Sequence, residues 1–175
     1  MLSPIVIRPA APSDIKDITA IYGHAVEHGT ASFEIEPPSL AEMTTRQKLL
    51  LDRGFPYLVA DAGGTVAGFA YAGPYRPRIA YRHSVEDSVY VNPRVHRRGI
   101  GRLLLTELIA SAEERGFRQM IAVIGDSRQA SSIALHRNLG FSPVGTLTNV
   151  GFKHGQWLDT VLMQRPLGKG ADAPP

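Results

Sequence analysis

The feature that most constrains this chain is a strand, a glycine-bearing turn and a long helix in direct succession between residues 88 and 115. The β-branched segment Val89-Tyr90-Val91 predicts the strand, and leucines at helical spacing from Leu104 predict the helix. Gly99 and Gly101 lie at the expected start of that helix, where the first N–H groups have no partner within the helix. Glycines let the main chain approach an anion closely, and the helix dipole favours negative charge there. We therefore expect an anion-binding site at this turn.

Arginines are concentrated around the same turn. Seven of them fall between residues 76 and 102, in a chain of 19 basic and 16 acidic side chains. Arg97, Arg98 and Arg102 flank the glycines, and a guanidinium pairs well with phosphate. The turn is not a Walker loop, because no Gly-Lys-Ser/Thr follows, and it lacks the third glycine of a dinucleotide fingerprint. Taken alone, two glycines also suit an ordinary turn, so the pattern leaves both interpretations open.

Hydrophobic periodicity and turn residues predict further helices and strands on both sides of this unit. Ser13 and Ser39 are expected to cap helices that end near Gly29 and Gly54, the second with a capping box to Glu42. Further helices are expected after Gly99, ending at Gly116, and over 130–139; strands are expected over 57–60, 65–71, 84–91, 120–124, 144–152 and 157–164. Asp61-Ala62-Gly63-Gly64 joins the first two strands as a hairpin. The order predicts an α+β domain with a mixed, mostly antiparallel sheet.

Length and composition exclude several classes of protein. The 175 residues suit one domain over 1–167, followed by a tail over 168–175 whose composition predicts disorder. There are no cysteines, and the six histidines are scattered, so we expect neither a disulfide scaffold nor a metal site. No apolar run approaches the length of a membrane span, and the first residues lack the features of a secretory signal, so a cytoplasmic protein without membrane contact is expected. Glu86 and Asp87 interrupt the basic stretch, and no nucleic-acid-binding signature is present, so no nucleic-acid partner is expected.

The motifs taken together resemble a known superfamily. Val89-Tyr90-Val91-x5-Arg97-Arg98-Gly99-Ile100-Gly101, the long helix, an apolar strand and Leu135-His136-Arg137-Asn138-Leu139-Gly140-Phe141 resemble the GNAT N-acetyltransferases, from about Ile5 to Arg165. Within that superfamily, the segments 30–34, 72–76, 85–91, 122–127 and 150–159 look like the phosphinothricin N-acetyltransferase group. The resemblance implies a three-layer α/β/α fold with helices on both faces of the sheet. It also implies acetyl transfer from acetyl-CoA to the α-amine of phosphinothricin, methionine sulfoximine or methionine sulfone.

The resemblance also implies how acetyl-CoA is held. In such folds the strand carrying Val89, Tyr90 and Val91 separates from its neighbour, so that its main chain can bond the pantetheine arm and one N–H can stabilise the developing oxyanion. The pyrophosphate is expected at Arg97, Arg98, Gly99, Ile100, Gly101 and Arg102. Two residues depart from the family pattern: His96 replaces the usual Gln or Arg, and Gln129 replaces an Asn that bonds the CoA arm. Both departures affect affinity more than the ability to bind.

Two residues are candidates for proton transfer. Glu86 matches the family position of the base that removes a proton from the substrate ammonium, and an amine attacks only as the free base. The alternative for Glu86 is a surface salt bridge to Arg82 or a neighbouring arginine. His136 lies where many members carry a tyrosine, and it could protonate the departing CoA thiolate. The alternative for His136 is a structural histidine on a helix.

The expected acceptor contacts come from three segments. Tyr75, Arg76, Arg78 and Arg82 could bind a phosphinate, sulfone or carboxylate oxygen, although a solvated basic loop is the alternative. Phe33 could pack against the aliphatic part of the substrate. Lys153 and Trp157 match family positions near a second face of the site, where the partner in a homodimer contributes. An acetyltransferase for another amine or peptide and a non-catalytic acyl-CoA sensor remain alternative functions.

Overall fold

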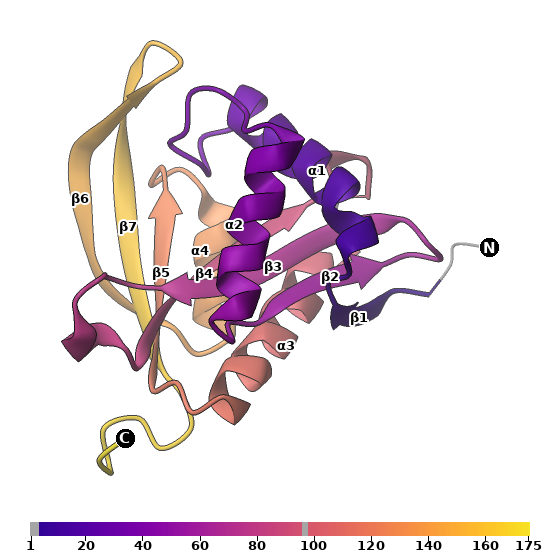
Figure 1. The fold of residues 1–175 in the computed structure, drawn as a ribbon. Coiled ribbons are helices and arrows are strands. Elements are labelled where there is room, and N and C mark those ends of the chain that lie inside the picture. Colours follow the sequence, from indigo (N-terminus) through magenta and orange to yellow (C-terminus); the bar gives the residue numbers. More distant parts are fainter. Residues whose placement is uncertain (1–3, 96–97) are drawn as a thin grey trace.

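One seven-stranded sheet organises residues 4–95 and 98–175, which are the residues described by a computed structural model (Figure 1). The strands lie in the order β1-β2-β3-β4-β5-β7-β6, and β4 and β5 form a parallel pair within an otherwise antiparallel ladder. The mixed, mostly antiparallel sheet predicted from the sequence is confirmed. The strands are β1 (Val6–Pro9), β2 (Tyr57–Asp61), β3 (Val66–Pro74), β4 (Ser84–Val91), β5 (Gln119–Gly125), β6 (Ser142–Lys153) and β7 (Gln156–Pro166).

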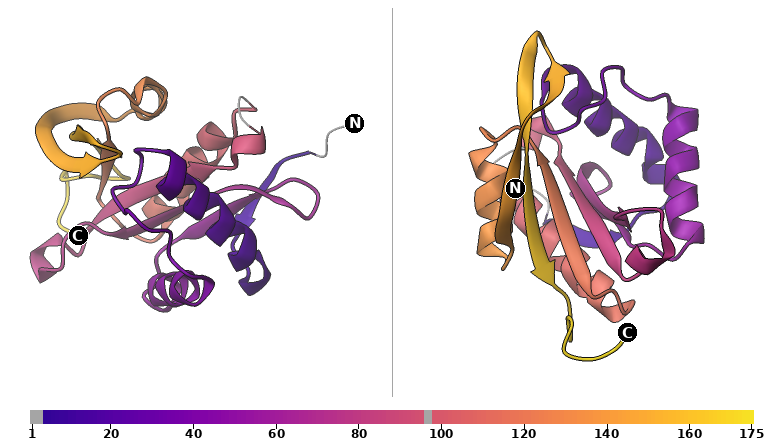
Figure 2. Two further views of the ribbon diagram at one scale, coloured as in Figure 1. Left: turned by 90° about the horizontal axis from the view of Figure 1, so that it is seen from above. Right: turned by 90° about the vertical axis from the view of Figure 1, so that its left-hand side faces the viewer.

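Helices cover both faces of the sheet (Figure 2). Helices α1 (Ile15–His28) and α2 (Leu40–Asp52) lie on one face, and α3 (Ile100–Glu114) and α4 (Ala130–Asn138) lie on the other. Each face has its own hydrophobic core. Leu104, Leu105 and Leu108 of α3 are fully buried on one face, whereas Ile18 and Val26 of α1 are fully buried on the other. The sheet is therefore the middle one of three layers, as the resemblance implied.

The helix starts agree with the sequence in one case and differ in the other. Ser39 caps α2, since its Oγ accepts a hydrogen bond from the N–H of Glu42 at 3.1 Å. Glu42 pairs with Arg46, one turn further along the helix. The predicted cap at Ser13 is wrong, because a short 3-10 turn over Pro12–Asp14 precedes α1. The Asp14 carboxylate accepts hydrogen bonds from the Ala11 N–H and from Arg8, so it organises the turn instead.

The chain ends contain one element that the periodicity did not predict. Strand β1 is only four residues long and pairs antiparallel with β2 at the edge of the sheet. At the other end, residues 168–175 contain neither helix nor strand, and Arg118 donates hydrogen bonds to the carbonyl oxygens of Gly170 and Pro174. The disorder expected for this tail stays a prediction. Within the described ranges, no helix has both the length and the apolar character needed to cross a membrane.

Candidate active site

Strands β4 and β5 separate in the middle of the sheet. They pair only over residues 84–87 and 119–122. Beyond that point β4 stays paired with β3, and β5 stays paired with β7. The edge of β4 over residues 88–91 that faces β5 is therefore open, and its N–H and C=O groups are available to a bound molecule. The separation implied for Val89, Tyr90 and Val91 is present.

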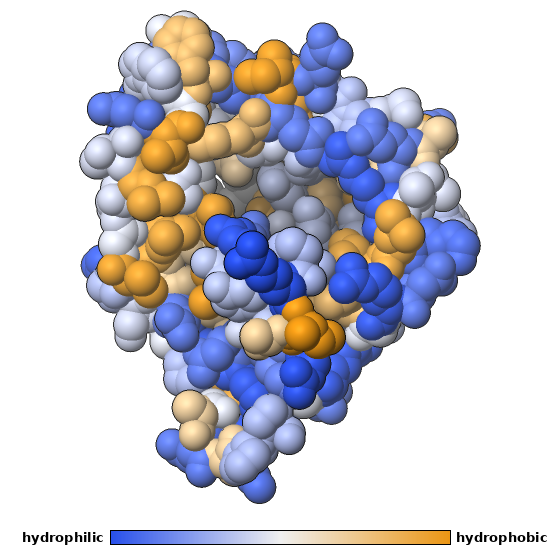
Figure 3. Space-filling view, turned by 60° about the vertical axis from the view of Figure 1, so that its left-hand side comes forward, coloured by the Kyte–Doolittle hydropathy of each residue, from blue (hydrophilic) through white to orange (hydrophobic). Residues whose placement is uncertain are grey.

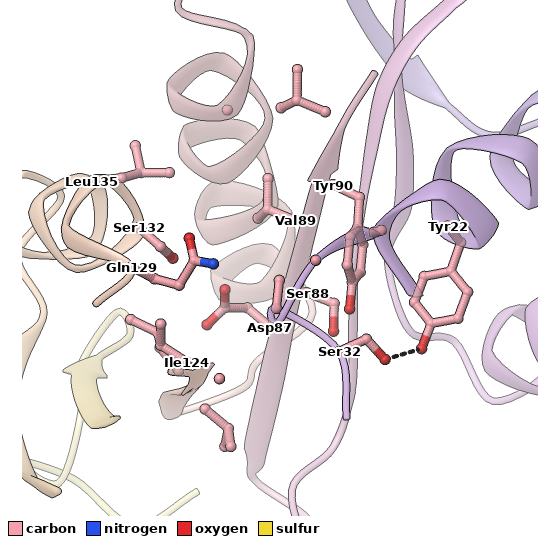
Figure 4. A pocket seen from close by; sticks show the side chains of 18 of the residues that line it. Tyr22, Ser32, Asp87, Ser88, Val89, Tyr90, Ile124, Gln129, Ser132 and Leu135 are labelled. Atoms are coloured by element: carbon pink, nitrogen blue, oxygen red, sulfur yellow. Dashed lines mark hydrogen bonds between the residues drawn. The ribbon is translucent and has the colours of Figure 1, made fainter. Parts of the chain in front are cut away.

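A cavity of about 730 Å³ occupies this opening, which is within the usual size range of small-molecule sites. Figure 4 shows Tyr22, Ser32 and Tyr90 on one side of β4, and Gln129, Ser132 and Leu135 on the other side. Residues from both faces of the sheet, on the α1 side and on the α4 side, thus line the cavity. Its lining includes Ile21, Tyr22, Phe33, Tyr71, Glu86, Asp87, Ser88, Val89, Tyr90, Val91, Gly101, Gly125, Gln129, Ser132, Leu135 and His136.

The glycine turn lies at the α4 side of this cavity. Gly99 has a φ of 71° and precedes the first residue of α3, so a left-handed conformation starts the helix there. Gly101 lines the cavity in the first turn of α3. A Cβ at Gly101 would lie 3.5 Å from Leu135 Cδ2 and 3.8 Å from Val91 Cγ2, which are ordinary contacts. Packing within the protein therefore does not require a glycine at this position.

Two of the three arginines near the turn lie within the described residues. His96 and Arg97 lie outside the described residues. Arg98 is half-buried and Arg102 is exposed. The Ile100 side chain is 2 % exposed and belongs to the core under α3, so only its main chain is available to a ligand. The predicted strand, glycine turn and helix are confirmed as local structure.

Gln129 connects the cavity to a polar network at the start of α4. Its Nε2 donates to Thr30 Oγ1 at 3.1 Å, and Thr30 Oγ1 donates to Asp126 Oδ2 at 3.0 Å. The hydrogen bond from Arg128 to Asp126 lowers the pKa of that carboxyl to about 2. Asp126 is therefore ionised at neutral pH and holds the segment after α1 against the start of α4.

Asp87 and His136 form a buried pair at the base of the opening. Nε2 of His136 lies 2.9 Å from Oδ2 of Asp87, and both side chains are at most 5 % exposed. Nδ1 of His136 lies 2.7 Å from the carbonyl oxygen of Ser132. Oδ1 of Asp87 is buried and has no hydrogen-bond partner among the described residues. Both ring nitrogens of His136 are thus engaged, and Asp87 carries the unused acceptor.

These contacts determine where the protons of the pair lie. A carbonyl oxygen can only accept a hydrogen bond, so Nδ1 of His136 carries a proton. A second proton lies between Nε2 and Oδ2. Burial lowers the pKa of His136, but the hydrogen bond and the charge of Asp87 raise it by more, so that it lies above its ordinary value. The imidazolium form facing a carboxylate is therefore favoured.

Glu86 lies on the other face of β4 from Asp87, because successive strand residues alternate. It is half-buried and lines the cavity. Burial raises the pKa of the Glu86 carboxyl, and the charge of Asp87 raises it further, whereas Arg76 lowers it. A carboxylate with a raised pKa is a stronger base than an exposed one, which suits proton abstraction.

The predicted acceptor residues are not all at the cavity. Phe33 lines it, with 37 % of the residue exposed. Tyr75, Arg76, Arg78 and Arg82 belong to the loop after β3 and are not in the described lining. Arg76 lies over the Tyr75 ring, 4.4 Å from its centroid, and its charge reaches Glu86. Of this group, Arg76 is the one that the structure connects electrostatically to the cavity.

Lys153 and Trp157 lie on the β6–β7 hairpin, away from the cavity lining. Lys153 is 3 % exposed, and its Nζ donates to the carbonyl oxygen of Ser32 at 2.7 Å. Burial lowers its pKa, which the nearby Glu34 partly offsets. Trp157 is 63 % exposed and packs edge to face with Phe152. Lys153 therefore supports the main chain of the segment that carries Phe33.

Sequence patterns did not single out several residues of the cavity, notably Asp87, Tyr22, Ser32 and Tyr71. Asp87 is next to Glu86, but its partner His136 is 49 residues away, and no local pattern reports such a pair. Alternation along the strand was the available signal, since it puts Asp87 on the face opposite Glu86.

The sheet opening, the glycine turn and the cavity together define an acyl-CoA-binding transferase fold. A model of the acetyltransferase (GNAT) family matches residues 19–141, and the chain belongs to that family. It is an N-acetyltransferase that uses acetyl-CoA as cosubstrate, as the resemblance implied.

The chain is similar to several N-acetyltransferases whose names state their substrates. The chain is 52% identical to a phosphinothricin N-acetyltransferase of Alcaligenes faecalis, over 94% of this chain and 83% of that protein. It is 41% identical to an L-methionine sulfoximine/L-methionine sulfone acetyltransferase of Pseudomonas aeruginosa, over 96% of this chain and 98% of that protein. Among solved structures, a phosphinothricin acetyltransferase from Sinorhizobium meliloti in complex with AcCoA superposes with a TM-score of 0.95. It is 49% identical, over 98% of this chain and 92% of that chain.

Proposed function

We propose that this enzyme acetylates the α-amine of a small amino acid with a tetrahedral side-chain group, such as phosphinothricin, methionine sulfoximine or methionine sulfone. The observation that carries the proposal is the cavity through the sheet, with Glu86 on the α1 side and Gly101 at the α4 side. The names of the relatives at 41–52% identity supply the substrate class.

Acetyl-CoA fits the α4 side of the cavity. The open edge of β4 over 88–91 offers N–H and C=O groups to an amide-containing chain, and Oδ1 of Asp87 is a buried acceptor without a partner among the described residues. The N–H groups in the first turn of α3 have no partner within the helix, and no side chain of the described residues caps them, so this turn suits an anion, with Arg98 and Arg102 next to it. The main chain of residues 99–101 would hold the pyrophosphate, and Gln129 the arm. The cosubstrate supplies the acetyl group as an activated thioester.

On the other side, Glu86 acts as the base. The acceptor arrives as an ammonium and must lose a proton before it can attack. Glu86 takes that proton, directly or through water, and passes it to solvent. Phe33 packs against the aliphatic part of the acceptor, and Arg76 attracts its anionic group.

His136 contributes through its pair with Asp87. Because both ring nitrogens are hydrogen-bonded, His136 does not act as an isolated acid. The pair keeps one proton between Nε2 and Oδ2 next to the cavity, where a leaving thiolate needs one. Asp87 therefore takes part in the proposed proton transfer. His136 orients the Asp87 carboxylate and shares its proton with it.

One assay tests the proposal. The purified enzyme is mixed with acetyl-CoA and a panel of amines, and thiol release is followed. Release with methionine sulfone or phosphinothricin that is lost in E86Q, while CoA binding measured by calorimetry is retained, supports the assignment. Release with peptides alone moves the acceptor, and CoA binding without any release indicates a sensor.

We further propose that two copies associate through β6. This strand is at the edge of the sheet, and its side chains Val144, Leu147, Val150 and Phe152 are each at least 50 % exposed. Figure 3 shows hydrophobic residues gathered on the side of the molecule that carries β6, next to a hollow in the surface. Edge strands with apolar side chains favour pairing with another chain. Sedimentation analysis should show that the wild type is a dimer and that the charge introduced by L147K disrupts it. A monomeric wild type contradicts the proposal.

The cytoplasmic location stays a prediction, tested by fractionation.

A further inference from the structure

The Phe33 ring lies against two glycines from different strands. Gly125 ends β5, and Gly151 lies near the end of β6. We infer that Gly151, together with the irregular segment of β6 that precedes it, sets the position of Phe33 and thereby selects which acceptors fit. The inference rests on the proposed function, because it assigns a residue of the hairpin to acceptor specificity.

Space is the reason for a glycine at 151. A Cβ there would lie 2.6 Å from Cδ2 and 3.0 Å from Cζ of Phe33, closer than van der Waals contact allows. Gly151 is absent from the residues with a positive φ, so its backbone would accept alanine. At Gly125 an added Cβ would lie 2.5 Å from the Thr30 carbonyl oxygen and 2.9 Å from Cε1 of the same ring. The ring therefore fills the space beside Gly151, and it shares the space beside Gly125 with the main chain of Thr30.

An irregularity in β6 brings Gly151 to this position. The pairing with β7 shifts between Leu147 and Gly151, and Asn149 between them has a φ of 54°. The Asn149 N–H donates to Oδ1 of Asp159 on β7 at 3.0 Å, which fixes the irregular segment. Extra residues of this kind bend a strand and redirect the side chains that follow.

The segment that carries Phe33 is held from several sides. Its neighbour Ser32 accepts a hydrogen bond from Lys153 Nζ through its carbonyl oxygen at 2.7 Å. The Ser32 hydroxyl lies 3.0 Å from the Tyr22 hydroxyl. Thr30 is bonded to Asp126. Because the main chain on the N-terminal side of Phe33 is fixed by these bonds, a side chain at 151 displaces the ring more readily than the loop.

The ring lies on the acceptor side of the cavity. Figure 4 shows Ser32, which precedes Phe33, on the same side of β4 as Tyr90. Glu86 shares that face by alternation along β4. A displaced ring therefore changes the space beside the proposed base and leaves the glycine turn of α3 untouched.

The experiment compares G151A with G145A on the same strand. Gly145 has no atom within 4 Å of an added Cβ, and its φ is not positive, so it is a matched control. We expect G151A to raise the acceptor KM about tenfold, with the acetyl-CoA KM unchanged, as for lost binding on one side only. G145A should match the wild type. In an F33L background, where the shorter side chain leaves room, G151A should change the acceptor KM less than about twofold.

The outcomes are distinguishable. Equal behaviour of G151A and G145A in an active enzyme would overturn the inference alone, and so would an effect of G151A that persists in F33L. An equal rise in both KM values would indicate general damage and also overturn it. A wild type that releases no thiol with any amine would overturn the proposed function and the inference with it.

Discussion

His136 on α4 and Asp87 on β4 face each other where β4 and β5 separate, with 2.9 Å between Nε2 and Oδ2. The pair links the helix on one side of the opening to the strand on the other. The same contact therefore affects both the geometry of the opening and the protonation of the groups in the cavity.

Replacing Asp87 by asparagine preserves size and removes the charge. The imidazolium form of His136 then loses its partner, and the proton held by the pair is no longer available to the thiolate. We expect D87N to lower kcat about 100-fold, within the usual range for a lost acid or base. Thiol-release kinetics measure this, and calorimetry should find CoA affinity little changed. D52N, at an exposed position on α2, is the control; a D87N enzyme with wild-type kcat contradicts the role.

The same pair makes folding stability depend on pH. Burial lowers the pKa of His136, but the Asp87 hydrogen bond, the charge of Asp87 and the Ser132 carbonyl together raise it by more, so the folded-state pKa lies above its ordinary value of 6.5. The contribution of His136 is therefore complete below about pH 6.5 and is lost as pH rises through the higher folded value. The difference in Tm between wild type and H136Q should shrink from about pH 6 to about pH 9. H24Q, which removes an exposed histidine of α1, is the control for the loss of an imidazole. A difference for H136Q that grows with pH disagrees with the pairing.

Arg76 affects the pKa of Glu86, the proposed base, without lining the cavity. A carboxyl group in that role abstracts a proton only when ionised, so we expect kcat/KM to fall as pH drops through the pKa of Glu86. Burial and Asp87 raise that pKa, and Arg76 lowers it. R76A should therefore move the acidic limb of the kcat/KM profile to higher pH, whereas R78A should leave it in place. An acidic limb that stays unchanged in R76A would mean that another group controls it.

A substitution at Gly101 is expected to affect CoA binding without lowering folding stability. Alanine there makes only ordinary contacts with Leu135 and Val91, and a glycine in a helix costs about 0.5–1 kcal/mol relative to alanine. G101A should keep or raise the Tm while it weakens CoA binding roughly tenfold, because the added methyl group keeps an anion from the main chain. Thermal unfolding and calorimetry on the same sample test both parts. Unchanged affinity would remove the main chain of this turn from the binding site.

Ser39 and Ser13 give a matched test of helix capping. Ser39 satisfies the N–H of Glu42, so S39A should lower stability by about 1 kcal/mol. For a chain of this length the Tm falls by about 3 °C. S13A should have little effect, because Ser13 is exposed and α1 starts after a 3-10 turn without it. Equal losses in both variants would contradict the assignment of the caps.

Local patterns predicted most of the elements because each pattern has a local cause. The turn at Gly63 and Gly64 has positive φ at both residues, so the hairpin of β2 and β3 follows from the sequence. The strand over 84–91 has the predicted bounds. At the start of α1 the prediction failed, because Asp14 bonds Arg8 and Ala11 and so competes with the expected serine cap.

Local patterns alone predicted the glycine turn, and the family resemblance added Glu86, Phe33, Gln129 and His136, all of which line the cavity. The glycine turn and Glu86 belong to one continuous stretch of sequence. The engagement of His136 by Asp87 and of Lys153 by Ser32 depends on tertiary distances across 49 and 121 residues. No spacing rule reports such contacts. Lys153 was expected at the substrate, yet its ammonium group is used to hold the loop.

The parallel contact between β4 and β5 is only four residues long. Within the sheet, two antiparallel units, β1 to β4 and β5 to β7, are therefore joined by a narrow strip, and residues of both units line the opening. Variation in the segment after α1 and in the β6–β7 hairpin can reshape one end of the cavity while the strip and the helix start stay intact. Because of this division, the acceptor amine can change on one scaffold while the site for the acetyl donor is preserved.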